Sequence, residues 1–183
     1  NKQGFKKKIL PPWEKEEKDF FCQDTPGFIP RLIREIIMRR QKVKEALKKG
    51  TTPILEAKSQ SLKLLANSFY GYLGFPNARW YCHECAEATT AYGRYYIKHT
   101  IKEAEKNGFK VIYSDTDSIF IALQEKKVAE VKQFQKSINK ELPGVMELEY
   151  EGHYPAGIFV GTKSGKGGAK KRYALLNKDD ELK

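Results

Sequence analysis

Two carboxylates, Asp115 and Asp117, stand between two apolar runs rich in β-branched and aromatic residues. This pattern predicts a β-hairpin over residues 109–123 whose tip carries the carboxylates. In extended backbone, residues two apart point to the same face, so both side chains would lie together on a stiff edge. Such oxygen ligands suit a hard cation such as Mg2+. Asp and Ser are also common turn residues, so this stretch taken alone also fits a plain polar turn.

A pair of cations, Arg40 and Lys44, lies one turn apart on a helix that the spacing of apolar residues predicts over 31–49. Arg can bind a phosphate through two donors and Lys as a point charge, so the pair could hold a phosphate chain or be a solvated surface. The chain has 34 Lys and Arg against 23 Asp and Glu, a net charge of +11. That surplus favours a polyanionic partner: nucleic acid, nucleotide or an acidic membrane surface.

A second helix is predicted over 54–73, and the turn at 50–53 joins it to the first in an antiparallel hairpin. It carries Lys63, Asn67 and Tyr70 at positions i, i+4 and i+7, which share one stripe of a helix. A core stripe would be apolar, and a solvated stripe would seldom carry Tyr. The composition therefore sets this stripe apart from both.

The remaining elements complete an α+β fold. Helices are predicted over 84–107 and 126–141, and strands over 146–151, 157–162 and 170–176. Together with the hairpin, these strands would form an antiparallel sheet against which the helices pack.

Two of these strands carry charge in a regular pattern. Strict alternation over 146–151 places Glu147, Glu149 and Glu151 on one side, either as a solvated face or as added acidity beside the aspartates. The strand over 170–176 begins with three cations and an aromatic residue. That beginning fits contact with a sugar–phosphate backbone, or a Lys-rich edge strand protected from aggregation.

Cys82 and Cys85 have the spacing of a metal-binding pair. A structural zinc site usually needs two such pairs, so cysteines buried at a helix start are favoured over zinc. The three cysteines form no disulfide framework, which predicts a reducing compartment. No apolar run approaches the roughly 20 residues of a membrane helix and no signal peptide is visible, which predicts a cytoplasmic protein without a membrane partner. The loop at 163–169 lacks the spacing of a phosphate-binding P-loop.

Three separated stretches resemble motifs of the family B DNA polymerases, and most closely those of the archaeal replicative enzymes. Residues 63–71 resemble the fingers motif K-x-x-x-N-S-x-Y-G, residues 113–118 the palm motif Y-x-D-T-D-S, and residues 170–173 the primer-duplex motif K-K-x-Y. Each motif has limited specificity alone. Their shared order and spacing make the resemblance, which covers residues 20–176, highly specific.

The resemblance implies template-directed DNA synthesis with two Mg2+ ions, primer–template DNA and deoxynucleoside triphosphates. It implies that Asp117 ligates both metals with Asp115 beside them, and that Glu149 and Glu151 are acidic palm residues near the metals. Phosphoryl transfer needs metals at the attacking and leaving oxygens, and cations where charge shifts towards pyrophosphate. It also implies a nucleoid-associated, cytoplasmic location in an archaeon or a similar organism.

The same resemblance assigns the helix pair to the incoming nucleotide and the last strand to DNA. Lys63 would act in catalysis, Asn67 would support the nucleotide, and Tyr70 would pack against the nascent base pair. The pair could close over the nucleotide and complete the site only when the base pair fits. The residues implied to bind nucleotide are Arg40, Lys44, Lys63, Asn67 and Tyr70, and those implied to bind DNA are Gly71, Lys170, Lys171, Arg172 and Tyr173.

The resemblance divides the chain into an irregular lead-in from the palm (1–30), the fingers hairpin (31–73), the C-terminal part of the palm (74–176) and the start of the thumb or a tail (177–183). The family carries another palm aspartate, in a D-x-x-S-L-Y-P motif ahead of the fingers, and no such segment occurs here. We therefore expect the chain to be inactive by itself. It would need the N-terminal polymerase portion that carries this aspartate and the exonuclease domain.

Two other interpretations are weaker. A non-catalytic DNA-binding or scaffold fragment of a decayed polymerase would keep the fold and the charge. It would not need to hold Asp115 and Asp117 crowded together at a cost in free energy. A nucleotide-sugar transferase could use Asp-Thr-Asp for its metal, but the basic helix pair and the basic strand end speak against it.

Overall fold

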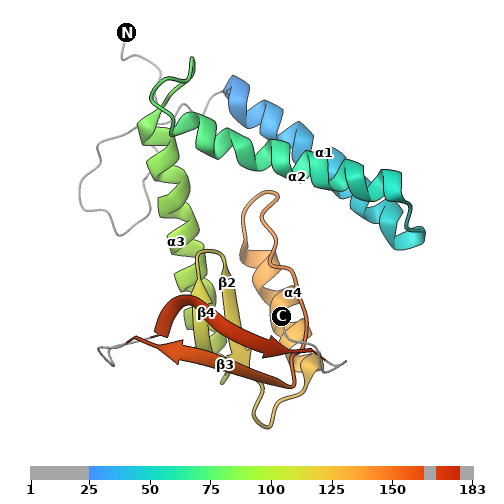
Figure 1. Cartoon of the computed structure of the whole chain (residues 1–183), viewed down its shortest axis with the longest axis vertical. Helices are drawn as coiled ribbons and strands as arrows, with labels where there is room; N and C mark the ends of the chain where they lie inside the picture. Colours follow the sequence, from blue (N-terminus) through green and yellow to red (C-terminus); the bar gives the residue numbers. More distant parts are fainter. Residues whose placement is uncertain (1–24, 163–167, 178–183) are drawn as a thin grey trace. The chain divides into compact units, whose positions relative to one another are not determined.

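The computed structural model describes residues 25–162 and 168–177, which form four helices and four strands. The predicted α+β class is confirmed. The chain divides between Tyr92 and Gly93 into two compact units, and each is described by itself (Figure 1). The predictions for most of the lead-in, for loop residues 163–167 and for the tail beyond Asn177 lie outside the described residues.

In the first unit, α1 (Phe28–Lys49) and α2 (Pro53–Leu73) lie side by side as the predicted antiparallel hairpin (Figure 1). α1 begins three residues earlier than predicted and includes Pro30. Proline is tolerated in a first helical turn because its missing N–H would have no partner there. α2 begins with a side-chain cap, because the Thr52 hydroxyl oxygen accepts a hydrogen bond from the N–H of Leu55 at 3.3 Å.

The two helices pack along a narrow seam. The buried residues of α1 are Ile36 and Val43, which are two turns apart and share one face of the helix. α2 contains no fully buried residue, and its Leu64 and Leu65 are exposed. Most of the surface of α2 is therefore open within this unit.

The third helix, α3 (His83–Lys106), begins in the first unit and continues into the second. It ends where the sequence predicts, because Gly108 adopts a φ of +73° that a side chain would disfavour. The chain then reverses, and the N–H of Phe109 donates to the carbonyl of Ala104 at 3.0 Å. This reversal starts the first strand.

The core of the second unit lies between α3, α4 (Val128–Glu141) and the antiparallel hairpin of β1 (Lys110–Asp115) and β2 (Ser118–Ala122). The rings of Phe109 and Phe134 pack there with centroids 5.3 Å apart. Because Phe109 directly precedes β1, the core anchors the root of the hairpin, and the turn lies at the opposite end. The buried core residues are Ala104, Phe109, Phe134 and Ile138.

A second antiparallel pair, β3 (Ala156–Gly161) and β4 (Gly168–Leu176), crosses the first pair (Figure 1). The described strands thus form two two-stranded sheets, where the sequence predicts a single sheet. One aromatic side chain from each strand joins the pairs, and all ring centroids in this cluster lie 5.2 to 5.8 Å apart. The four rings belong to Tyr113, Phe120, Phe159 and Tyr173.

The prediction of a strand over 146–151 is wrong. The N–H of Leu148 donates to the side chain of Asn139 at 2.8 Å, and its carbonyl accepts from Asn139 at 3.0 Å and from Gln135 at 2.7 Å. Both amide side chains come from α4, so this backbone is bonded to a helix rather than to a strand. The alternation itself is real, since Leu148 and Tyr150 are half-buried and the three glutamates around them are exposed. Alternation indicates which residues of a segment are buried, but it does not show that a neighbouring strand is there to pair with the segment.

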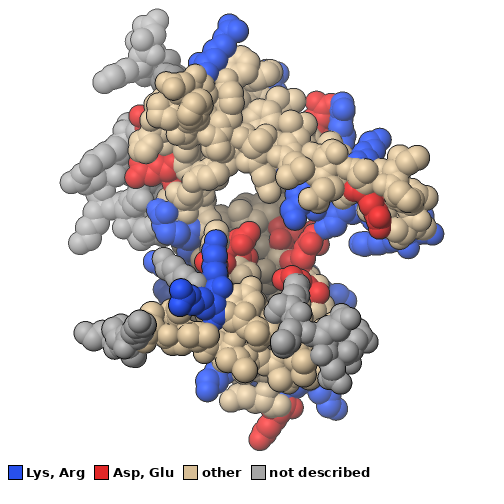
Figure 2. Space-filling view, viewed as in Figure 1, with Lys and Arg blue, Asp and Glu red and all other residues tan. Residues whose placement is uncertain are grey.

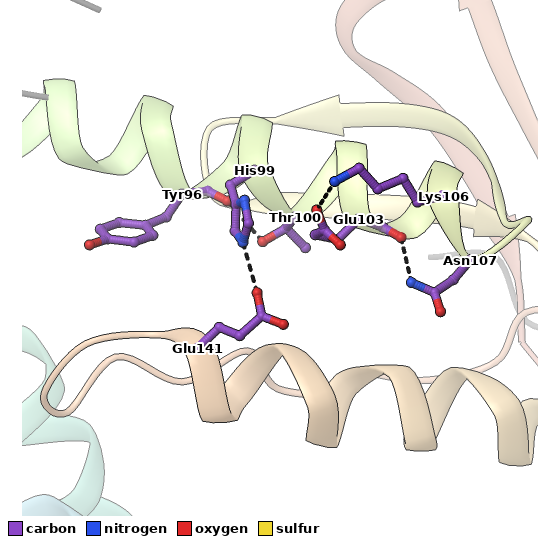
Figure 3. A network of polar contacts seen from close by, with 7 residues as sticks. All are labelled: Tyr96, His99, Thr100, Glu103, Lys106, Asn107 and Glu141. Carbon is purple, nitrogen blue, oxygen red and sulfur yellow. Dashed lines mark hydrogen bonds and ion pairs between the residues drawn. The ribbon is translucent and has the colours of Figure 1, made fainter. Parts of the chain in front are cut away.

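One polar contact between side chains also joins α3 to α4 (Figure 3). Nε2 of His99 on α3 lies 3.0 Å from an Oε2 of Glu141 at the end of α4, and the ring of Tyr95 stacks on His99. One turn further along α3, the hydrogen bond from Lys106 to Glu103 lowers the pKa of the Glu103 carboxyl and raises the pKa of Lys106. The contact between His99 and Glu141 joins the two helices, whereas the stacking of Tyr95 and the bond from Lys106 to Glu103 lie within α3.

Candidate functional site

The turn of the β1–β2 hairpin holds the two predicted aspartates. Asp115 is the last residue of β1 and pairs with Ser118, so the connection consists of Thr116 and Asp117. The N–H of Asp117 donates to the carbonyl of Asp115 at 2.7 Å, which closes a three-residue turn of the γ type. The backbone between the aspartates is therefore not extended, and the expectation that they share a strand face is wrong. One tight turn carries both of them instead.

Thr116, between the aspartates, has a φ of +54°. β-branched residues are seldom found there because Cβ crowds the backbone, and such strain costs roughly 1–3 kcal/mol. Local hydrogen bonds oppose the strain: Oγ1 of Thr116 donates to Oδ1 of Asp115, and Oγ of Ser118 donates to the Asp115 carbonyl, each at 3.1 Å. Strain of this kind clusters at functional turns, and the sequence pattern gave no sign of it.

The aspartate pair fits a Mg2+ site. Asp115 is half-buried and Asp117 is exposed. Mg2+ is usually held by one or two carboxylates together with waters and substrate phosphates, which is what two hard oxygen donors on an open turn can provide. Within residues 25–162 and 168–177, no three His, Cys, Asp or Glu side chains lie close enough to form a metal group. Glu149 and Glu151, which are exposed on the segment after α4, therefore do not complete such a group with the aspartates.

The helix pair carries the predicted nucleotide-binding cations at one level. Arg40 lies 9 residues before the end of α1, and Lys63 lies 10 residues after the start of α2. At about 1.5 Å of rise per residue, both are about 14–15 Å from the connecting turn. Lys44 is one turn nearer to that turn on α1. Antiparallel packing thus sets the three cations at neighbouring heights, which suits an extended phosphate chain.

The surroundings of these residues differ between the two helices. On α2, Lys63, Asn67 and Tyr70 are exposed, whereas Arg40 and Lys44 on α1 are half-buried. The Nε of Arg40 is buried and has no hydrogen-bond partner among the described residues. A buried N–H without a partner costs free energy, so the internal contacts of this unit do not explain why Arg40 is there. Figure 2 shows further Lys and Arg side chains along the helix pair, with carboxylates among them.

Gly71 follows Tyr70 on the same helix. A Cβ placed at Gly71 would meet no atom within 4 Å in the described part of the chain. The unit itself therefore gives no steric reason for glycine at this position. The open space leaves room for the close approach of a ligand or another backbone.

The basic strand end lies on β4. Lys171, Arg172 and Tyr173 are exposed, while Lys170 belongs to β4 and its side chain lies outside the described residues. Lys171 has a φ of +59°, and its N–H donates to the hydroxyl of Tyr113 at 2.7 Å. Sequence reasoning missed this role of Tyr113. The available signal was its place at the head of the Y-x-D-T-D-S motif.

Cys82 and Cys85 lie at the start of α3, with their Sγ atoms 2.8 Å apart. Cys82 also contacts the Glu84 carboxylate at 3.7 Å. The predicted position at a helix start is confirmed, but both thiols are half-buried rather than buried.

None of the helices in the described ranges is long and apolar enough to cross a bilayer.

Comparison with known proteins adds an independent observation. The family model described as DNA polymerase family B matches residues 12–181. The DNA polymerase of Thermococcus gorgonarius is 47% identical over 171 residues, which cover 88% of this chain and 21% of that protein. DNA polymerase 1 of Pyrococcus abyssi is 44% identical over 170 residues (88% and 21%), and the DNA polymerase of Pyrococcus glycovorans is 42% identical over 191 residues (100% and 23%). The chain thus spans about a fifth of the length of these curated relatives.

Proposed function

Because the chain belongs to DNA polymerase family B, we propose that it supplies the fingers and the C-terminal part of the palm in template-directed DNA synthesis. The reaction is transfer of a deoxynucleotide to a primer 3′ end. The observation that carries the proposal is the family match over residues 12–181, within which Asp115 and Asp117 stand together on one strained turn.

In this proposal Asp117 and Asp115 hold two Mg2+ ions. Bound metal would stabilise the attacking and leaving oxygens of the displacement. Three features support the assignment: the donors are hard oxygens, Asp117 is exposed, and the turn is braced by the bonds from Thr116 and Ser118. Glu149 and Glu151 are candidates for added acidity near the metals.

The helix pair holds the incoming triphosphate. Arg40 and Lys44 bind its phosphates, and Lys63 stabilises the negative charge that shifts towards pyrophosphate as the bond breaks. Arg40 and Lys63 lie at about the same distance from the turn that connects the two helices, which supports this assignment. Asn67 and Tyr70, exposed on the same stripe as Lys63, support the nucleotide and pack against the nascent base pair.

The primer–template duplex is held by the basic end of β4 and by the open position at Gly71. Lys171 and Arg172 are exposed cations, and cations that replace counterions on phosphates supply most of the affinity for a DNA backbone. Tyr173, which is 38% exposed, follows these cations on β4, and Lys170 precedes them. The net charge of +11 agrees with a DNA partner.

The family's other palm aspartate comes from a D-x-x-S-L-Y-P segment outside these 183 residues. We therefore expect this chain to extend a primer only together with an N-terminal polymerase portion that carries that segment. The location that fits this work is the nucleoid of an archaeon or a similar organism.

Primer extension tests the proposal directly. A recessed primer–template, Mg2+ and deoxynucleoside triphosphates are supplied to the chain alone, to the upstream portion alone and to their mixture. The proposal predicts extension only in the mixture. No extension in any of the three samples, with duplex binding by the chain intact, would replace it with a non-catalytic DNA-binding fragment. Extension by the chain alone would show that the outside aspartate is not required, and Glu149 and Glu151 would be tested next.

A further inference from the structure

The hydroxyl of Tyr113 joins the aspartate hairpin to the basic strand end. It accepts a hydrogen bond from the N–H of Lys171 at 2.7 Å, across 58 residues of sequence and between two separate sheets. This distance is at the short end of the usual N–H···O range. The ring of Tyr113 is half-buried in the cluster with Phe120, Phe159 and Tyr173, so the hydroxyl is held in place by packing. The bond lies at an exposed position, but its acceptor is fixed by the packed ring of Tyr113.

Strand β4 bulges at the place where this bond is made. The register pairs Phe159 with Tyr173 and Gly161 with Gly168. Between these pairs β3 has one residue and β4 has four, so the extra residues of β4 have no partners on β3. Lys171 lies among them with a left-handed φ of +59°, which is unfavourable for a residue other than glycine. Its N–H donates to the hydroxyl of Tyr113 instead of to a backbone carbonyl of β3.

A bulge can aim side chains at a ligand, provided that something holds it. On the β4 bulge, Lys171 and Arg172 are exposed, and they precede Tyr173, whose ring belongs to the four-ring cluster. Tyr113 stands two residues before Asp115 on β1, and both are half-buried positions on the same face of the strand. One short strand thus carries a proposed metal ligand and also fixes the backbone of the proposed DNA-binding bulge.

We propose that Tyr113 is a positioning residue for primer–template DNA: its hydroxyl holds the β4 bulge so that the Lys171 ammonium meets a backbone phosphate. The inference rests on the proposed function and extends it to a residue that touches no substrate. Without the hydroxyl, the Lys171 backbone is free to leave its strained conformation, and the cation leaves its phosphate.

The test uses Tyr113→Phe, which removes the hydroxyl and keeps the ring. Tyr96→Phe is the matched control, because Tyr96 lies in the same unit and its hydroxyl bonds to no described residue (Figure 3). Affinity of the full chain for a recessed primer–template is measured by fluorescence anisotropy at several salt concentrations. Tyr113→Phe should weaken binding about five- to tenfold, and loss of one phosphate contact should lower the salt slope by about one. Tyr96→Phe should change neither.

A double variant separates positioning from general damage. If Tyr113 acts through Lys171, then Tyr113→Phe with Lys171→Gln should bind no more weakly than Lys171→Gln alone. Additive losses would overturn the proposal, and so would wild-type affinity and salt slope in Tyr113→Phe. Hydrogen exchange at the Lys171 amide reports whether the hydroxyl holds the Lys171 backbone, and it does so without DNA. It therefore distinguishes failure of this inference from failure of the proposed function. Faster exchange in Tyr113→Phe with unchanged DNA binding would show that the hydroxyl holds the Lys171 backbone but does not position the chain on DNA, which would overturn the proposal. No primer–template binding by the wild-type chain would overturn the proposed function itself, and with it the role of Tyr113.

Discussion

The two groups of candidate site residues are held in place by different means. On the helix pair, the cations stand at regular helical positions over a narrow seam, and the polar stripe of α2 is exposed. In the second unit, the aspartates stand on a strained turn whose hairpin is anchored by a buried core and a cluster of four rings. The regular backbone of a helix places side chains at fixed positions with little packing around them. A strained turn keeps its conformation only when the structure beneath it is well packed. Substitutions in the first group should change binding, and those in or beneath the second should change turnover or stability.

The largest loss of stability is expected from Phe134→Ala. This ring is buried in the core under the hairpin and packs on Phe109, so its removal should lower the free energy of unfolding by about 3–5 kcal/mol. The control is Ile54→Ala, since Ile54 is 79% exposed on α2 and should change stability by less than about 0.5 kcal/mol. Chemical denaturation measures both. Similar losses in the two variants would contradict the contrast between a packed base and an open helix pair.

A smaller effect, on nucleotide binding, is expected from Lys63→Gln. Loss of a charge-assisted hydrogen bond to phosphate should raise the KM for deoxynucleoside triphosphates about 10- to 100-fold in the reconstituted enzyme. The kcat should fall as well, because Lys63 also stabilises the charge that shifts towards pyrophosphate as the bond breaks. Lys58→Gln is the matched control, because Lys58 is exposed on the same helix and lies on a different face. Steady-state extension kinetics give both constants. An unchanged KM in Lys63→Gln, or an equal rise in Lys58→Gln, would remove the assignment of this stripe to the triphosphate.

Gly71→Ala should separate stability from DNA binding. Alanine is favoured over glycine inside a helix, and there is open space at this position, so the variant should gain about 0.5–1 kcal/mol of stability. The added methyl group should nevertheless weaken primer–template binding if DNA approaches there. Gly93→Ala on α3 is the control: its position is equally open, so it should gain stability without losing affinity. Unchanged DNA affinity in Gly71→Ala would argue that no ligand approaches this glycine.

The smallest effect concerns pH. The Glu130 carboxylate accepts a hydrogen bond from the N–H of Lys127 at 2.8 Å, and this bond lowers the pKa of Glu130 from its ordinary value of 4.5. A depressed carboxyl pKa contributes stability above the unfolded value that is lost as the pH falls through the folded value. The unfolding midpoint of the wild-type chain should therefore fall more steeply below pH 4.5 than that of Glu130→Gln. Parallel pH profiles would show that this cap contributes nothing.

Much of the fold could be predicted from the sequence because local signals decide it. Apolar spacing predicted the helices, and flanking apolar runs predicted the hairpin of β1 and β2. The strand expected over 146–151 failed because its alternation was real but α4 side chains, and no strand, bond its backbone at Leu148. That competition depends on residues distant in sequence, which periodicity does not report.

The candidate site divides in the same way. The level placement of Arg40 and Lys63 follows from helix lengths and a short turn, so sequence reasoning could approach it. The γ-type turn at Thr116 and the bond from Lys171 to Tyr113 could not be predicted. Both depend on backbone conformations that residues other than glycine rarely adopt, and on packing between strands that are far apart in the chain.

The measurement that tests the central claim most directly is single-turnover primer extension by the reconstituted enzyme with Asp117→Asn in this chain. Loss of a carboxylate that holds the metals should lower the rate about a thousandfold, while triphosphate and duplex binding by the helix pair and β4 stay within about threefold of wild type. Glu125→Gln, an exposed carboxylate beyond β2, should extend at the wild-type rate. Extension by Asp117→Asn at the wild-type rate would contradict the account, because the strained turn would then have no part in the chemistry.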